Sequence, residues 1–306
     1  MPTPQPPEHL AVHARPPAPR RRPGWALAAL LAGATGIAFA PIFVRMAETG
    51  PVATAFWRLL LALPILFAWA RRVQAGSTPP QPKRWALLAA TGVAFAGDLG
   101  FWHVSIQATS VANSTFLVNL APVFVAIGAA MLFGERIRSL FVLALALALS
   151  GAALLVGANL GGHAALYGDA LALVAAVFYA AYQLCVKHLR GHLSAPQILA
   201  GSGVAAALAL GAVAVSLGEP LLPVSWRGWA ILVASALVCQ VAGQTLITYA
   251  VAHLQASLSS ISLLLQPVMA TLFAWLLFGE LFSPWQWLGG LLVLTGIWLA
   301  RRASNA

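Results

Sequence analysis

Hydrophobic residues fall in long runs along this chain, separated by short joints that are polar or contain Pro and Gly. A helix needs about 20 apolar residues to cross the ~30 Å hydrocarbon core of a bilayer. Only a helix satisfies every backbone N–H and C=O group of such a segment internally. The pattern therefore predicts an all-α membrane protein with ten transmembrane helices. The predicted spans are 25–46, 51–70, 85–107, 109–133, 138–157, 168–188, 196–217, 228–251, 255–278 and 284–300.

The first 24 residues are rich in Pro and Arg and contain too little apolar surface for a core, so we expect a disordered tail. A signal peptide is the alternative interpretation of the first apolar run. Arg20 to Arg22 resemble its basic region, and Ala38-Phe39-Ala40 resembles its cleavage site. The apolar run is longer than that of a signal peptide, and Pro41 would directly follow the cut. We therefore expect a retained helix.

Composition supports the membrane assignment. Of the 306 residues, 60% are hydrophobic and only 8% are charged, and the mean hydropathy is +0.85. Soluble domains carry roughly 25% charged residues, so a soluble enzyme, a nucleic-acid-binding domain and a disordered regulator are excluded. Cys185 and Cys239 both lie in apolar runs and form neither a disulfide framework nor a zinc set. We expect no metal and no cofactor.

The basic residues that give the chain its net charge of +10 are distributed unevenly. With ten spans, nearly all of them lie on the side that holds both chain ends, and only Arg45 and Arg227 lie on the other side. Cytoplasmic loops carry the excess of Lys and Arg. The chain is therefore predicted to be a multi-pass protein of the cell inner (plasma) membrane with both termini cytoplasmic.

An internal repeat organises the spans. Residues 121–135 (APVFVAIGAAMLFGE) and 266–280 (QPVMATLFAWLLFGE) are identical at seven of 15 positions, at an offset of 145 residues. The repeat predicts two five-helix halves, 25–157 and 168–300. Because five is odd, the second half enters the membrane from the opposite side. Inverted repeats of this kind are a common design of secondary transporters.

Several short motifs accompany the repeat: Pro51 with Phe56-Trp57-Arg58, the pair Pro122…Gly134-Glu135 and Pro267…Gly279-Glu280, and Gly168-Asp169. Through these motifs residues 25–300 resemble the drug/metabolite transporter superfamily, in its EamA-like, ten-helix branch. The resemblance implies export or exchange of small organic metabolites, often amino acids, across the inner membrane. One departure is that Gly203 stands where the repeat would place a second Arg58.

Arg58 and Asp98 lie at matching depths in the antiparallel second and third predicted spans. A charged side chain inside the membrane costs at least ~2.5–3.5 kcal/mol and usually pairs or faces a cavity. We expect either an ion pair between them or two poles of one polar binding site. An ion pair that only holds the two helices together fits the sequence equally well.

Polar and aromatic side chains on helix faces predict a central cavity with a substrate site near the bilayer midplane. The candidate substrate-binding residues, besides Arg58 and Asp98, are Trp102, Asn113, Asn119, Tyr179, Tyr182, Gln183, Gln240, Gln244 and Gln266. For any single residue, hydrogen bonding between helices is the alternative. Pro122 and Pro267 occupy equivalent mid-span positions and predict helix breaks beside the site.

These features predict a secondary transporter, not an enzyme, that exports small organic metabolites such as amino acids by alternating access. Its expected partners are the metabolite and the lipid bilayer, with a proton as the candidate coupling ion and no nucleic acid. Glycines of the fifth and tenth spans could form a homodimer face. Two alternatives remain: an intramembrane serine protease, from Gly201-Ser202-Gly203, and a non-transporting scaffold or receptor. Glu135 and Glu280 lie at span ends, where a structural role is expected.

Overall fold

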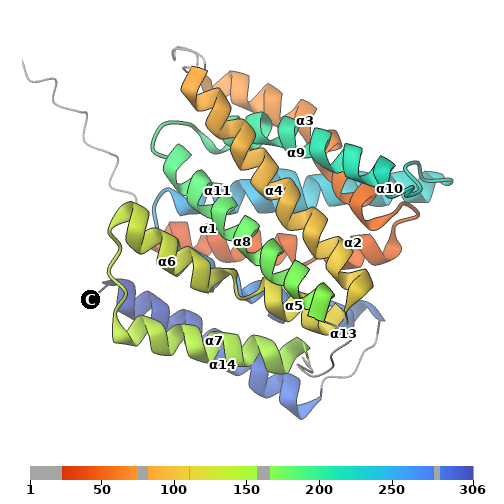
Figure 1. The fold of residues 1–306 in the computed structure, drawn as a ribbon. Helices are drawn as coiled ribbons and strands as arrows, with labels where there is room; N and C mark the ends of the chain where they lie inside the picture. The colour runs from red at the N-terminus through yellow and green to blue at the C-terminus, as the bar shows by residue number, and fades with distance from the viewer. Residues whose placement is uncertain (1–22, 75–81, 110, 157–165, 279–282, 306) are drawn as a thin grey trace, which may run out of the picture.

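The computed structural model describes residues 23–74, 82–109, 111–156, 166–278 and 283–305 (Figure 1). Within these ranges all regular elements are helices. Eight helical segments are long and apolar enough to cross a membrane, and Ser139–Leu155 is a shorter apolar helix. The chain is thus an all-α membrane protein. The tenth predicted span corresponds to a further helix, Pro284–Asn305, which is not among the eight, so the number of ten stays a prediction.

The described helices form two series, one before and one after residues 157–165. The first series is α1 (Pro23–Ile37), α2 (Ala40–Met46), α3 (Pro51–Gln74), α4 (Pro82–Ala108), α5 (Val111–Val118), α6 (Ala121–Phe133) and α7 (Ser139–Val156). The second series is α8 (Leu166–Leu189), α9 (Ala195–Ser216), α10 (Trp226–Ser235), the π-helix η2 (Ala236–Gln244), α11 (Thr245–Val251), α12 (Ala256–Ser262), α13 (Leu265–Phe278) and α14 (Pro284–Asn305).

Helix interruptions recur at equivalent positions of the two series. The α5–α6 break lies just before Pro122, and the α12–α13 break lies just before Pro267. Proline has no N–H group and is favoured in the first turn of a helix, although Pro64 lies inside the continuous helix α3. At Pro122 and Pro267 the chain stops one helix and starts the next. A third break, between α1 and α2, precedes Pro41 in the same way.

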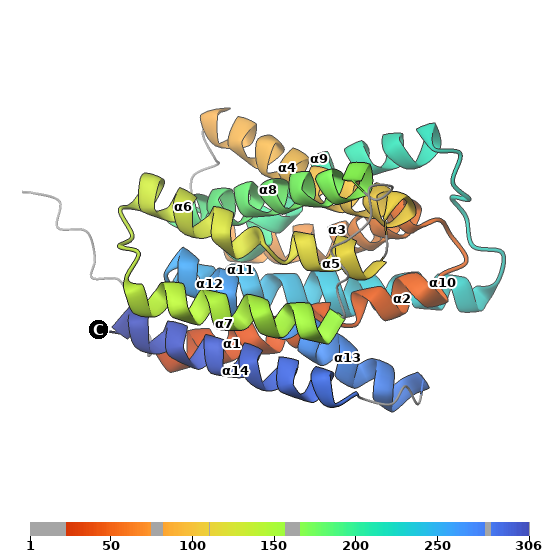
Figure 2. The same cartoon turned by 60° about the horizontal axis from the view of Figure 1, so that its bottom comes forward.

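The three most extensive helix pairs are α7 with α14, α4 with α8, and α3 with α9. Figures 1 and 2 both show α7 and α14 side by side along one edge of the bundle. Their approach is close because glycines face each other. A Cβ atom at Gly151 would lie 2.5 Å from the carbonyl oxygen of Gly289. Small residues of this kind let two membrane helices pack backbone to backbone.

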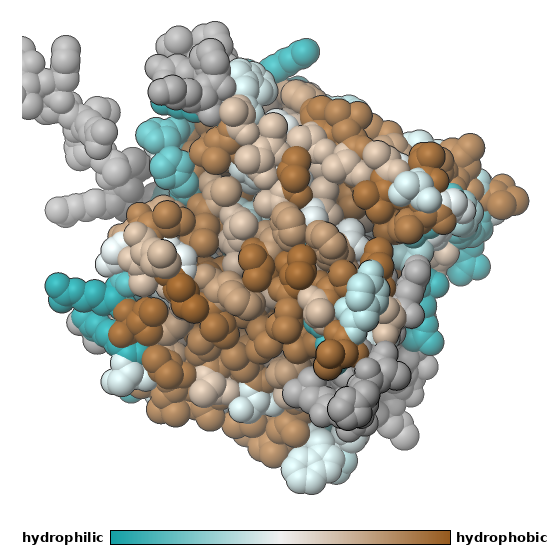
Figure 3. All heavy atoms as spheres, viewed as in Figure 1, coloured by the Kyte–Doolittle hydropathy of each residue, from teal (hydrophilic) through white to brown (hydrophobic). Residues whose placement is uncertain are grey.

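The surface is apolar around the middle of the bundle, and hydrophilic side chains gather at its two ends (Figure 3). Exposed tryptophans lie near helix ends: Trp25 is 74% exposed, Trp85 52% and Trp285 66%. Tryptophan at these positions is typical of the interface between lipid and water. The exposed apolar surface therefore fits a bilayer rather than water.

Two carboxylates join the halves at the end of the bundle away from both termini. Glu219 accepts hydrogen bonds from the backbone N–H groups of Val52 (3.3 Å) and Ala53 (2.8 Å), in the first turn of α3. Glu48 accepts hydrogen bonds of 2.9 Å from the N–H groups of Val224 and Ser225, just before α10. Each carboxylate thus satisfies N–H groups at the start of a helix in the other half.

Candidate functional site

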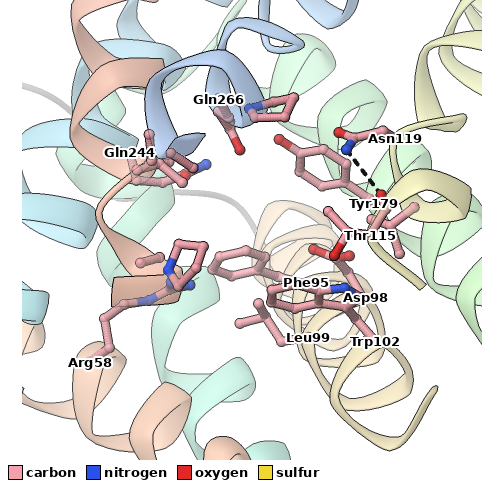
Figure 4. Close-up of a pocket in the computed structure, with 17 residues that line it drawn as sticks. Arg58, Phe95, Asp98, Leu99, Trp102, Thr115, Asn119, Tyr179, Gln244 and Gln266 are labelled. Atoms are coloured by element: carbon pink, nitrogen blue, oxygen red, sulfur yellow. Dashed lines mark hydrogen bonds between the residues drawn. The ribbon is translucent and has the colours of Figure 1, made fainter. Parts of the chain in front are cut away.

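A cavity of about 160 Å³ opens between the two halves, where the interrupted helices meet (Figure 4). On this measure a water needs about 10–15 Å³, so the cavity has room for roughly ten waters or one small organic molecule. Its walls come from the α1–α2 turn and from α3, α4, α5, α8, η2 and α13. Residues of both halves therefore line one shared space.

Arg58 and Asp98 both line this cavity. Figure 4 places Arg58 on one side and Asp98 on the other, with the Phe95 ring between them. The Arg58 guanidinium carbon lies 5.9 Å from the centroid of that ring, within cation–π range. The Nε atom of Arg58 is buried and has no hydrogen-bond partner. Both charged side chains therefore face the same cavity.

The helix breaks place two amides at the cavity. Asn119 lies in the α5–α6 break and Gln266 lies at the start of α13, beside Pro267. Asn119 Nδ2 donates a hydrogen bond of 2.9 Å to the carbonyl oxygen of Thr115, which leaves the amide oxygen facing other partners. Figure 4 shows the Tyr179 hydroxyl and the Gln266 amide pointing toward each other across the cavity. The breaks thus supply polar groups between the charged poles.

An aromatic layer lies behind one wall. Phe95 stacks on Tyr182 with ring centroids 4.5 Å apart and an interplanar angle of 18°. Tyr182 is only 2% exposed, and its hydroxyl accepts a 2.8 Å hydrogen bond from Gln244 Nε2. Gln244 itself lines the cavity. Tyr182 therefore supports the wall without being part of it.

The structure brings together seven of the predicted binding residues: Arg58, Asp98, Trp102, Asn119, Tyr179, Gln244 and Gln266. Pro267 lines the cavity as well, whereas Pro122 is buried in α6. Tyr182, Gln183 and Gln240 are buried among the helices and do not line it. The side chain of Asn113, like Glu280, lies outside the described part of the structure.

Sequence reasoning missed the apolar half of the lining. Phe95 and Leu99 on α4 line the cavity together with Ile37 and Pro41 on either side of the α1–α2 break. Phe95 and Leu99 carry no signal, because an apolar residue in an apolar span looks like any lipid-facing residue. Pro41 did carry a signal, since a proline inside a predicted span marks an interruption.

Ser202, the residue behind the protease alternative, is 2% exposed in α9. Its hydroxyl donates a 2.7 Å hydrogen bond to the carbonyl oxygen of Ile198, one turn earlier in the same helix. The residue does not line the cavity. Serine hydroxyls commonly bond the preceding turn in this way inside membrane helices.

Comparisons with known proteins agree with this architecture. The EamA-like transporter family matches the chain twice, over residues 24–157 and 166–302. A curated relative from Streptantibioticus cattleyicolor, named a probable terminal-alkyne amino-acid exporter, is 32% identical over 229 residues, which cover 72% of this chain and 73% of the relative. An uncharacterized transporter from Archaeoglobus fulgidus is 24% identical over 277 residues, covering 84% of this chain and 91% of that protein.

A solved crystal structure has the same fold. It superimposes with a TM-score of 0.78 at 17% sequence identity and covers 92% of this chain and 98% of the solved one. At that identity the likeness concerns the fold alone. The two family matches together span most of the chain, from residue 24 to residue 302. The protein therefore belongs to the EamA-like transporter family.

Proposed function

We propose that this chain is a secondary transporter that exports small zwitterionic metabolites, amino acids among them, by alternating access. The observation that carries the proposal is the cavity with Arg58 and Asp98 on opposite sides and Phe95 between them. The name of the S. cattleyicolor relative supports the same substrate class.

The charges of the cavity favour a zwitterion for an energetic reason. A charged group inside the membrane is costly unless it finds a partner. The buried Arg58 Nε has none within the protein and is suited to a carboxylate. Asp98, at 7% exposure, offers a carboxylate to an ammonium group. A bound α-amino acid would supply both partners at once, and the Phe95, Leu99 and Ile37 side chains would surround its apolar part.

The charge distribution of the chain supports one orientation in the membrane. The excess of Lys and Arg on the side of both chain ends supports a cytoplasmic location of the termini in the inner membrane. Export would then begin at the end of the bundle where α6 ends and α7 begins. A proton remains the candidate coupling ion, and a pH gradient across the vesicle membrane tests it.

The experiment is leucine exchange by the purified protein in liposomes, with two competitors of the same shape. 3-Methylbutylamine lacks the carboxylate of leucine, and 4-methylpentanoate lacks its ammonium group. We expect unlabelled leucine to compete and both single-charge analogues to fail, because each leaves one pole without a partner. Competition by either analogue as strong as that by leucine would refute the zwitterion assignment.

Matched variants test the two poles. Arg58→Gln and Asp98→Asn should each abolish leucine exchange while the protein remains folded in the membrane. Arg227→Gln and Asp169→Asn make the same chemical changes outside the cavity and should leave exchange intact. Normal exchange by Asp98→Asn would show that Asp98 is not a pole of the site.

A further inference from the structure

Glu135, just beyond the end of α6, binds the start of α12 in the other half of the protein. One carboxylate oxygen accepts a 2.7 Å hydrogen bond from the N–H group of Ala256. The other accepts hydrogen bonds from the N–H group (3.2 Å) and the hydroxyl (2.7 Å) of Ser257. A carboxylate is stabilised at a helix N-terminus because the N–H groups there have no partners within the helix. The contact joins the two halves at the end of the bundle that holds the chain termini.

The turn between α11 and α12 is also bound at its other end, by Lys187 on α8. Its Nζ donates a 3.0 Å hydrogen bond to the carbonyl oxygen of Val251, the last residue of α11, and a second one to Leu254. A cation at a helix C-terminus complements the free carbonyl groups there. The turn between α11 and α12 is therefore held at its carbonyl side by a cation and at its N–H side by an anion.

The helix α12, which follows this turn, is buried and contributes no residue to the cavity lining. All seven of its residues are buried. Its counterpart in the first half is α5, whose Thr115 and Val118 line the cavity. The residues at the equivalent positions, Ser260 and Leu263, are only 1% and 4% exposed. Two helices at positions related by the 145-residue offset thus differ: α5 lines the cavity, and α12 is buried outside its lining.

The short helix α12 is also unusually polar for a buried segment. Ser259, Ser260 and Ser262 satisfy their hydroxyls on carbonyl groups of their own chain, at 2.8–2.9 Å. These bonds need no neighbouring helix, so α12 can move without leaving the hydroxyls unpartnered.

We propose that Glu135 is the latch that keeps the α12 end of the cavity closed, and that its release from Ala256 and Ser257 accompanies opening at that end. The inference rests on the proposed transport cycle. Glu135 acts as a positioning residue, because it lies outside the cavity lining and touches α12 rather than the substrate.

The test measures the accessibility of one cysteine. Cys185 and Cys239 are first replaced by Ala, and Ser260→Cys then places a thiol on the buried helix. Vesicles of known orientation are treated with a membrane-impermeant maleimide at the side of the chain termini. We expect slow labelling with Glu135 present and at least tenfold faster labelling with Glu135→Ala. Labelling at an unchanged rate in folded protein would overturn the proposal.

Glu219→Ala is the matched control. Glu219 also accepts two backbone hydrogen bonds at a helix start, but at the opposite end of the bundle. If loss of any such carboxylate merely loosened the fold, Glu219→Ala would speed labelling equally, and the latch would be refuted. Should Glu135→Ala fail to fold, Glu135→Gln takes its place: it retains an acceptor oxygen without the charge, and we expect an intermediate rate.

A second probe reports the other end of the cavity. Ala270→Cys, in the cavity lining, should be labelled more slowly from the opposite side when Glu135→Ala is present, because opening one end closes the other. Labelling requires no substrate, so the two proposals fail separately. An unchanged rate with intact leucine exchange refutes the latch alone. A shifted rate without exchange of any zwitterion refutes the proposed function and retains the latch.

Discussion

Gln244 Nε2 donates a 2.8 Å hydrogen bond to the hydroxyl of Tyr182, so that the π-helix η2 is tied to α8 directly behind the cavity wall. Gln244 faces the cavity, and Tyr182 is buried beneath it and stacked on Phe95. The hydrogen bond therefore holds the Gln244 side chain in place, although Tyr182 itself lies outside the cavity lining.

Removal of the Tyr182 hydroxyl should destabilise the protein. Tyr182→Phe leaves the buried Gln244 amide without its acceptor, which costs about 1–3 kcal/mol. We expect a lower thermal unfolding temperature in detergent. Tyr167→Phe is the control, because Tyr167 is 69% exposed and should change stability by less than about 0.5 kcal/mol. Equal unfolding temperatures for both variants would show that the bond contributes nothing.

The contact between α7 and α14 should tolerate no larger residue at Gly151. A Cβ there would meet the Gly289 carbonyl oxygen at 2.5 Å and the Val293 nitrogen at 2.7 Å. Both are backbone atoms, so the helices must separate, and overpacking of this kind costs about 1–3 kcal/mol or more.

We therefore expect Gly151→Val to lower the unfolding temperature. Gly290→Ala is the matched control, since its Cβ would meet only Val268 Cγ1 at 3.9 Å, an ordinary contact. A larger loss of stability for Gly290→Ala than for Gly151→Val would contradict the described packing.

Phe95 should matter for substrate affinity more than for folding. Its ring lies beside the Arg58 guanidinium at 5.9 Å, and a cation–π contact contributes about 0.5–2 kcal/mol. Phe95→Leu keeps the site apolar but removes that contact, so the KM for leucine should rise several-fold. Phe101 lies on α4 like Phe95, but it is outside the cavity lining and stacks on Phe178 of α8. Phe101→Leu should therefore leave the KM for leucine unchanged. An equal KM for both variants would show that Phe95 does not contribute to substrate binding.

Acid should weaken the contact between Glu48 and the start of α10. The Ser225 hydroxyl, and then the Ser225 backbone N–H group, donate hydrogen bonds to this carboxylate and lower its pKa below the ordinary value of 4.5. A lowered pKa in the folded state contributes stability above the unfolded pKa. That contribution is lost as the pH falls through the lowered value.

The measurement is the unfolding temperature from about pH 6 down to about pH 3. The difference in unfolding temperature between the wild type and Glu48→Gln should be constant near pH 6 and should shrink below about pH 4.5. The side chain of the Glu48→Gln variant does not titrate. A difference in unfolding temperature that grows on acidification would mean that the pKa of Glu48 is raised, not lowered.

The sequence by itself determined that the apolar runs form helices, and it marked the interruptions beside Pro122 and Pro267. The α1–α2 break lies inside the predicted span 25–46. The apolar runs could form only helices in a bilayer, because no other local structure pairs the backbone without water. Pro122 and Pro267 each lie in the first turn of a new helix, where the missing N–H group of proline costs nothing. Pro64, in contrast, lies inside the continuous helix α3. Charge inside an apolar span likewise singled out Arg58 and Asp98 before any fold was known.

Tertiary structure decided which residues meet at the cavity. Gln240 and Gln244 are four residues apart in the π-helix η2 and both are buried, yet only Gln244 lines the cavity. The sequence did not identify Phe95 as a lining residue, because an apolar side chain suits a position facing lipid as well as one facing the cavity. The 145-residue sequence repeat pairs α5 with α12, and only the packed structure shows that they differ, with α12 buried and α5 lining the cavity.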